Sequence, residues 1–379
     1  MTDNATSGVR AGDNGHWVLV TEGGNGQSRA AVAAVRALRR AGYRPAVTVS
    51  GSLSLAGTSR SCLRRVQVPL GESDPEGYAR AVRAELARQD YLAVFHSSDT
   101  ALLALNAPVR QLIDKESCAK LAASVGMAVP PSQIFDTSEE LLASASQLDY
   151  PIVVKPVIKR YLAARVDSAG ELPPVAARGG RVVVQPYLPN GMHGISGLMW
   201  QGELLAAVHL RYWRVWPAPC GTIASGETVP IDAELEEHLA ALLRGYNGVF
   251  HADFAGPYLL DLNPRIHASL PVTVAAGVNL VVQYCDLLRG VRVPPSRGKP
   301  GFVYRWVEGD MRSIIWSLRR GKLGPWAAFD ALRPRRGVVH SFASFTDPAP
   351  ARARVVYAVR RLKDRRKPRP DLDVVASST

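Results

Sequence analysis

Polar side chains at alternate positions of the segment 251–265 could hold a metal ion. Asp253 lies in one alternating run, and Asp261, Asn263 and Arg265 lie in the next, after a turn at 255–257. Side chains of a strand point alternately to its two faces. A hairpin centred on residue 257 therefore places Asp253 opposite Asp261 on one polar face. Two such carboxylates lie about 5 Å apart at Cβ, and they repel each other unless a cation lies between them.

The oxygen atoms of this face favour Mg²⁺. Carboxylate and carbonyl oxygens suit this hard ion, which normally binds phosphates at the same time. Asp253, Asp261 and Asn263 are the predicted metal ligands, and Arg265 adds a fixed cation for an anionic oxygen. The alternative is a polar outer strand face with incidental charges. The residues expected to pack on the core behind this face are Phe250, Ala252, Phe254, Tyr258, Leu260 and Leu262.

The elements that must position the hairpin begin with alternating strands and helices. Strand patterns at 17–21, 47–49 and 91–95, separated by helical patterns at 28–40 and 75–88, predict a parallel, doubly wound sheet. Two further helices are predicted at 109–126 and 138–147. Glycines and prolines then separate short strands, which predicts an antiparallel region with strands at 151–156, 161–166, 181–185, 194–200 and 203–211. A helix at 232–245 precedes the hairpin at 248–265.

Charge and cysteine usage exclude several classes of protein. The net charge is +13, but residues 352–369 hold nine Arg or Lys and one acid. Most of the net positive charge therefore lies in this one basic tail. This tail matches no nucleic-acid module. The four cysteines form no C-x-x-C pair, which argues against a disulfide framework or a structural zinc site. No run of 18 apolar residues occurs, so we expect no membrane span, and a cytoplasmic location fits best.

A glycine-rich turn after the first strand offers a different cofactor. Residues 24–29 follow the dinucleotide-binding pattern G-x-G-x-x-G up to its last position, where Arg29 replaces the third glycine. No acid follows a second strand at the expected distance of about 20 residues. A tight turn into a helix is therefore favoured over a dinucleotide site.

Four motifs in order resemble the ATP-grasp superfamily. The hairpin resembles the superfamily's metal hairpin, with an acid on one strand and an acid-x-Asn-x-Arg run on the next. The other motifs resemble its Asp-Lys helix followed by G-x-x-x-P, its phosphate-lysine strand and its adenine hinge. They are Asp114-Lys115 with 126–130, Tyr150–Pro156, and Val182–Leu188. The resemblance covers about residues 110–290.

The resemblance implies a role for each matched residue. Lys115 and Lys155 would meet the triphosphate of ATP, and the stretch containing Gln185, Tyr187 and Leu188 would hold adenine. Asp253, Asp261 and Asn263 would bind one or two Mg²⁺, which Mn²⁺ could replace. Arg265, with Lys155, would act in catalysis by steadying an acyl phosphate. Arg211 or Arg214 is expected to bind a substrate carboxylate, unless the strand that carries them is only an aromatic core strand.

The implied activity is an ATP-dependent carboxylate–amine ligase that forms an amide bond through an acyl phosphate and releases ADP and phosphate. Its partners would be a small carboxylic acid and an amine, such as an amino acid, without nucleic acid or membrane, and a homodimer is compatible with it. The alternatives are an ATP-grasp kinase or thioester-forming ligase, or an ATP-binding protein without turnover. Both hairpin acids are Asp where Glu is usual, and residues 157–161, directly after Lys155, contain no glycine where the superfamily often has a glycine-rich lid.

The implied fold is α/β (α+β), with a Rossmann-like parallel-sheet domain, a two-lobed ATP-grasp domain and a small C-terminal extension. The expected organisation is a disordered segment at 1–15, the Rossmann-like domain at 16–108, the two lobes at 109–184 and 185–290, and a separate appendage with the basic tail at 291–379.

Overall fold

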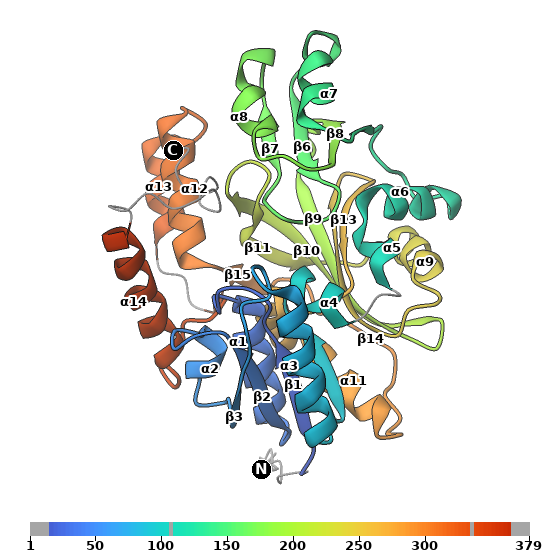
Figure 1. Cartoon of the computed structure of the whole chain (residues 1–379), viewed down its shortest axis with the longest axis vertical. Helices are drawn as coiled ribbons and strands as arrows, with labels where there is room; N and C mark the ends of the chain where they lie inside the picture. Colours follow the sequence, from blue (N-terminus) through green and yellow to red (C-terminus); the bar gives the residue numbers. More distant parts are fainter. Residues whose placement is uncertain (1–14, 106–108, 334–336, 365–379) are drawn as a thin grey trace, which may run out of the picture.

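The computed structural model describes residues 15–105, 109–333 and 337–364, which form three sheets (Figure 1). The prediction of disorder at 1–15 falls outside these ranges except for Gly15. No helix within the described ranges is long and apolar enough to cross a membrane.

The N-terminal sheet is parallel, as predicted, with strand order β3-β2-β1-β4. Its strands are β1 (Trp17–Thr21), β2 (Arg44–Val49), β3 (Arg64–Gln67) and β4 (Ala93–His96). The helices of this part are α1 (Arg29–Arg40), α2 (Leu55–Thr58), α3 (Pro75–Arg88) and α4 (Asp99–Leu105). Ser28 caps α1 by accepting a hydrogen bond from the Ala31 N–H at 3.1 Å, which ends the glycine turn and starts the helix.

A second, antiparallel sheet has the order β5-β8-β6-β7 and forms the green lobe of Figure 1. Its strands are β5 (Gln133–Phe135), β6 (Ile152–Pro156), β7 (Ala164–Val166) and β8 (Val182–Pro186), with α7 (Ser138–Ala143) and α8 (Pro173–Ala176) beside them. The helix predicted at 109–126 is two helices, α5 (Arg110–Ile113) and α6 (Lys115–Ser124). The break falls at Asp114, whose side chain caps α6 by accepting from the Ser117 N–H at 2.9 Å.

The third sheet is the largest and carries the hairpin. Its order is β13-β12-β9-β10-β11-β15-β16, with β14 (Ser296–Arg297) beside β10. The strands before residue 264 are β9 (Met192–Trp200), β10 (Glu203–Trp216), β11 (Thr222–Val229), β12 (Gly248–Ala255) and β13 (Tyr258–Asn263). Three helices belong to this part: α9 (Ala233–Leu242), α10 (Leu270–Ala275) and α11 (Leu280–Leu288).

The prediction that residues 291–379 form a separate appendage is wrong for the described part. β15 (Val303–Arg305) pairs with β11, and β16 (Val339–His340) pairs with β15, so this segment extends the large sheet. Helices α12 (Val307–Arg319), α13 (Pro325–Leu332) and α14 (Ala349–Asp364) lie together on one side of the molecule (orange to red in Figure 1). Strand pairing with β11 was not expected because β11 itself was not predicted.

Helix α1 joins the N-terminal sheet to this late segment. Arg36 pairs with Asp347 at 2.9 Å, and Arg29 donates to the Tyr304 hydroxyl at 3.2 Å. The guanidinium of Arg29 also lies 3.7 Å from the centre of the Trp306 ring, in a cation–π contact. The first helix of the chain is therefore held by residues about 300 positions later.

Candidate functional site

The hairpin formed by β12 and β13 has the predicted register at its polar positions. Asp253 is paired with Asp261, and His251 is paired with Asn263. The two carboxylates therefore lie directly across the strand pair, where like charges destabilise each other unless cations offset them. On the other face, Phe250, Ala252 and Phe254 are fully buried, as the alternation predicts.

A bulge near the turn changes the predicted faces. Phe254 pairs with Leu259 and Ala255 pairs with Tyr258, so Leu260 is an extra residue in β13. As a result Leu259 packs in the core, whereas Leu260, predicted to be a core residue, lines the cavity described below. The bulge also places the Leu260 carbonyl 2.7 Å from the Nζ of Lys155.

Two lysines, one on β6 of the second sheet and one on α6, meet this hairpin. Lys155 on β6 is buried, and Lys115 at the start of α6 pairs with Asp261 at 3.2 Å. Burial, with the neighbouring Lys115, lowers the pKa of Lys155 to about 8. Burial alone would raise the pKa of Asp261, but Lys115, Lys159 and Lys155 outweigh it and hold that pKa below its usual range. The hairpin carboxylate is thus ionised and surrounded by cations.

A cavity of about 370 Å³ lies where these groups meet. Charged side chains that line it are Lys115, Lys155, Lys159, Arg214, Asp253 and Asp261. Four cations against two carboxylates leave a net charge of +2 on the described lining, which suits a polyanion. Asn263, Gln185, Tyr187 and Leu188 also line it, so the structure brings most of the predicted site residues into one cavity.

The predicted adenine stretch forms one wall of this cavity. The Tyr187 N–H donates to the Pro151 carbonyl at 2.9 Å, and the Gln185 side chain donates to the Ser132 hydroxyl at 2.7 Å. Pro186 has no N–H. Within the described residues, Leu188 is therefore the member of this stretch whose backbone N–H has no protein acceptor.

Arg265 lies elsewhere than the sequence suggested. Its guanidinium is buried, forms an ion pair with Asp99 of α4, and donates to the Asn263 side-chain oxygen at 2.6 Å. Arg265 is not among the residues that line the cavity. This oxygen of Asn263, predicted to be a metal ligand, already accepts a hydrogen bond, although a carbonyl oxygen has a second lone pair.

The two arginines predicted to bind substrate differ in position. Arg211 is exposed, pairs with Glu227 and does not line the cavity. Arg214 lines the cavity, and it pairs with Asp310 of α12 at 2.5 Å and donates to Ser225 at 3.1 Å. Of these two arginines, Arg214 is therefore the one whose position allows contact with a ligand in the cavity.

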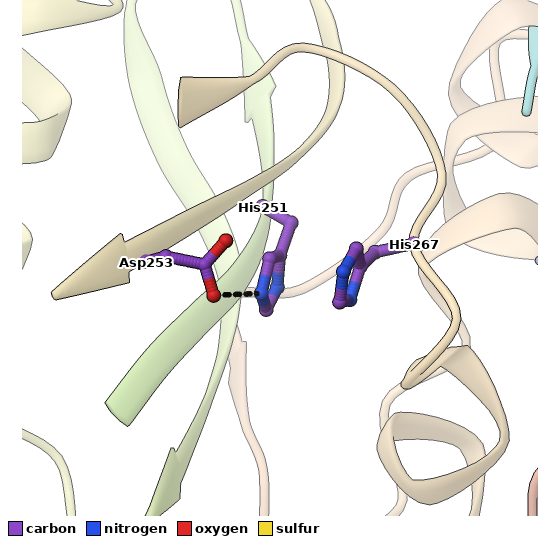
Figure 2. Close-up of side chains that lie close together, drawn as sticks. All are labelled: His251, Asp253 and His267. Carbon is purple, nitrogen blue, oxygen red and sulfur yellow. Dashed lines mark hydrogen bonds and ion pairs between the residues drawn. The ribbon is translucent and has the colours of Figure 1, made fainter. Parts of the chain in front are cut away.

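Sequence reasoning missed a network around Asp253; Figure 2 shows three of the side chains involved, His251, Asp253 and His267. The hydroxyl of Tyr212 donates to Asp253 at 2.7 Å and lies 2.8 Å from Nε2 of His251, whose Nδ1 bonds Ser196 at 2.8 Å. The rings of His251 and His267 stack in parallel with centres 3.7 Å apart. Their nitrogen lone pairs lie in parallel planes and do not converge, so we interpret His251, Asp253 and His267 as a hydrogen-bonded support rather than a second metal centre.

One glycine in the sequence, Gly194, marks the position of this network. Gly194 on β9 lies opposite Asp253, and a Cβ at this position would be 2.2 Å from the Tyr212 hydroxyl and 2.8 Å from Cε1 of His251. Only glycine leaves room for both rings beside the carboxylate.

Burial lowers the pKa of His267 well below its usual value, with His251 and Arg265 adding to the effect, so its ring is neutral at pH 7.

The glycine turn at 24–29 is covered by the late helices. Asn25 donates to the Tyr357 hydroxyl at 3.0 Å, and Arg354 donates to the Gln27 side chain at 3.2 Å. Arg29, in place of the third glycine, packs on Trp306. These contacts occupy the place where a dinucleotide would bind and agree with the tight-turn interpretation.

No protein-family model and no curated protein sequence matches this chain. Solved structures do match in fold. The L-amino acid ligase of Bacillus licheniformis superposes with a TM-score of 0.55 at 19% identity, over 72% of this chain and 74% of that one. The ADP complex of N5-carboxyaminoimidazole synthetase from Staphylococcus aureus gives a TM-score of 0.58 at 15% identity, over 74% and 79%.

A third match is the biotin carboxylase domain of the Hydrogenobacter thermophilus 2-oxoglutarate carboxylase, in complex with MgADP and bicarbonate. Its TM-score is 0.56 at 16% identity, over 76% of this chain and 73% of that one. Identities this low establish architecture rather than activity. Together with the three sheets and the lysine-facing hairpin, the structural matches confirm the fold expected from the sequence: the chain has the ATP-grasp fold.

Proposed function

We propose that this protein is an ATP-dependent carboxylate–amine ligase. It would activate a small carboxylic acid as an acyl phosphate, join it to an amine, and release ADP and phosphate. The observation that carries the proposal is the cavity in which Lys115 and Lys155 meet the paired carboxylates of Asp253 and Asp261. Two of the similar folds were solved with ADP, one of them as its magnesium salt.

The charges of the cavity support nucleotide binding in a defined orientation. Lys115, Lys155 and Lys159 offer point charges to a triphosphate, and Leu188 offers a backbone N–H to the adenine edge. Because a phosphate chain raises the pKa of a nearby lysine, ATP would hold Lys155 in its charged form. The same lysine donates to Leu260 in the free protein, so the bulged carbonyl keeps its Nζ in place.

The donor set fits Mg²⁺. Asp253 and Asp261 face each other across the strands, and both are oxygen ligands of the kind this ion prefers. Tyr212 donates to Asp253, and Lys115 pairs with Asp261, so each carboxylate is oriented by a neighbour. Bound between these residues and the phosphates, Mg²⁺ would neutralise charge that develops during phosphoryl transfer. Asn263 would contribute through the lone pair that Arg265 leaves free.

The test is ADP release from ATP and Mg²⁺ with a panel of carboxylic acids, each with and without a panel of amino acids. We expect ADP only when an acid and an amine are both present, with an amide product by mass spectrometry. Asp261→Asn should abolish turnover and keep the fold, because it removes a charge and little volume. Asp90→Asn, at an exposed carboxylate of the N-terminal part, is the matched control and should keep full activity.

Other outcomes identify the alternatives. A phosphorylated product without an amine indicates a kinase, and a product that needs a thiol indicates a thioester-forming ligase. Thermal stabilisation by MgATP with no ADP release under any condition indicates a binding protein without turnover. Wild-type turnover by Asp261→Asn at ordinary Mg²⁺ would remove the metal assignment.

A further inference from the structure

A buried ion-pair cluster joins helix α12 to the cavity. Asp310 is fully buried, and its two oxygens accept from Arg214 at 2.5 Å and from Arg305 at 2.6 Å. One carboxylate therefore faces two guanidinium groups, and the cluster carries a net charge of +1. A buried charge without a partner is costly. The surplus cation is stable only if water or an anion reaches it.

Arg214 is the member of this cluster that can meet a ligand. It lines the cavity, whereas Arg305 does not, and Arg305 also donates to the Ala331 carbonyl at 3.0 Å. The Nε of Arg214 is held by Asp310, and one terminal nitrogen is held by Ser225. Within the described residues its other terminal nitrogen has no partner, so a fixed donor remains for an anion in the cavity.

Helix α12 adds hydroxyl groups to the same wall. Ser313 and Ser317 line the cavity, and they follow Asp310 by three and seven residues. Residues at this spacing share one face of an α-helix. The face of α12 that holds Arg214 in place is therefore also the face that offers hydroxyl donors to a ligand.

This wall and the metal hairpin are carried by different strands of the large sheet. Strand β9 lies between β12, which carries Asp253, and β10, which carries Arg214. Neighbouring strands are about 4.8 Å apart, so about 10 Å separates these two strands. The guanidinium of Arg214 is held toward α12 by Asp310, so an anion bound to it contacts a different part of the lining from the metal hairpin.

We propose that Arg214, Ser313 and Ser317 form a subsite for a carboxylate of the substrate that does not react, with Asp310 as the positioning residue of Arg214. This proposal rests on the proposed ligase function and names a class of substrate for it. The carboxylate belongs either to a dicarboxylic acid or to an α-amino acid that serves as the amine. The segment after residue 290 then has a chemical role, because it supplies both the positioning carboxylate and the hydroxyl groups.

The test uses the full chain saturated with MgADP and measures thermal shifts with acids and their amides. One arm compares succinate and glutarate with succinamate and glutaramate, and the other compares L-alanine and L-glutamate with their α-amides. We expect acids of one arm to stabilise the wild-type protein more than the amides do. Arg214→Gln should weaken this binding about tenfold or more, because the variant loses a hydrogen bond to a charged group.

Matched variants keep the result interpretable. Arg211→Gln removes the same charge from an exposed position of the same strand and should bind like wild type. Arg214→Lys keeps the charge without the planar fork and should rescue only part of the binding. Asp310→Asn should weaken acid binding while the shift caused by MgATP stays unchanged. Asp310 stays paired with Arg305 when Arg214 is replaced, so the Arg214 variants should fold.

The outcomes separate this proposal from the ligase function. If no acid stabilises the wild-type protein more than its amide does, or if Arg214→Gln keeps the full difference, the subsite is wrong although MgATP still binds. Loss of acid binding in Arg211→Gln as well would also overturn it. A wild-type protein that MgATP does not stabilise refutes the proposed function instead.

Discussion

Replacing Lys155 with Met should separate the stability of the protein from its affinity for ATP. The lysine is buried, and burial lowers its pKa from an ordinary value near 10.5 to about 8. Below pH 8 the folded protein therefore contains a charge that costs about 3 kcal/mol relative to the unfolded chain. The hydrogen bond from Nζ to the Leu260 carbonyl returns about 1.5–3 kcal/mol of this. The free energy of unfolding of Lys155→Met at pH 7 should thus be close to that of wild type.

The pH dependence gives the sharper signature. Between about pH 8 and 10.5 the unfolded wild-type chain binds more protons at Lys155 than the folded protein does, so stability rises with pH in this window. Lys155→Met should lose this rise. Its affinity for ATP should fall about 30-fold or more, because removal of one partner of a buried charged hydrogen bond costs at least about 2 kcal/mol.

Two measurements check this prediction. Urea denaturation at pH 7, 8, 9 and 10 gives the stability, and calorimetric titration with MgATP at pH 7 gives the affinity. Lys120→Met is the matched control, because Lys120 is an exposed lysine that pairs with Glu116 on α6. The reasoning is refuted if Lys155→Met binds ATP as tightly as wild type, or if the rise in stability between pH 8 and 10 survives in the variant.

Three further predictions concern buried groups. Burial raises the pKa of Glu22 to about 7 from 4.5, so the free energy of unfolding of the wild-type protein should fall by up to about 3 kcal/mol as pH rises from 4.5 to 7. Thermal melts of Glu22→Gln over this pH range should lack the fall. If the variant shows the same dependence on pH as wild type, the assignment to Glu22 is wrong. Arg265→Ala should lower the free energy of unfolding by about 3 kcal/mol because it leaves Asp99 buried without its cation, and Asp99→Asn in the same chain should restore part of the loss. A variant that denatures like wild type would instead favour the catalytic role expected from the sequence. Gly194→Ala should cost about 1–3 kcal/mol by displacing Tyr212, and unchanged urea denaturation would show that the sheet can absorb the added methyl group.

Local patterns were enough for the parts of the fold that depend on neighbours in sequence. The alternation of β1, α1, β2, α3 and β4 predicted the parallel sheet, because each element has its own hydrophobic period. Strand β3 was missed, since Arg64-Arg65-Val66-Gln67 is an edge strand with only Val66 buried. Its place in the sheet depends on pairing with β2 rather than on an apolar run.

The features of the site also divide into those that depend on local sequence and those that depend on distant residues. The register of Asp253 against Asp261 followed from the two-residue period of strands, which holds until the bulge at Leu260. The bulge could not be predicted, because the group that meets its carbonyl is Lys155, 105 residues away in the sequence. The ion-pair partner of Arg265 could not be predicted for the same reason, since Asp99 is 166 residues away in the sequence. Sequence patterns identify which side chains carry charge, and long-range packing decides which charge each one meets.

The attachment of α1 to the late part of the chain has a consequence for synthesis in the cell. Arg36 precedes its partner Asp347 by 311 residues. At translation rates of about 5–20 residues per second, roughly 15–60 s pass between the two. During this interval Arg29 lacks Tyr304 and Trp306, and the surface of α1 that these residues cover is open to solvent. The contacts that α1 makes with the late segment therefore cannot form until the last quarter of the protein has been synthesised.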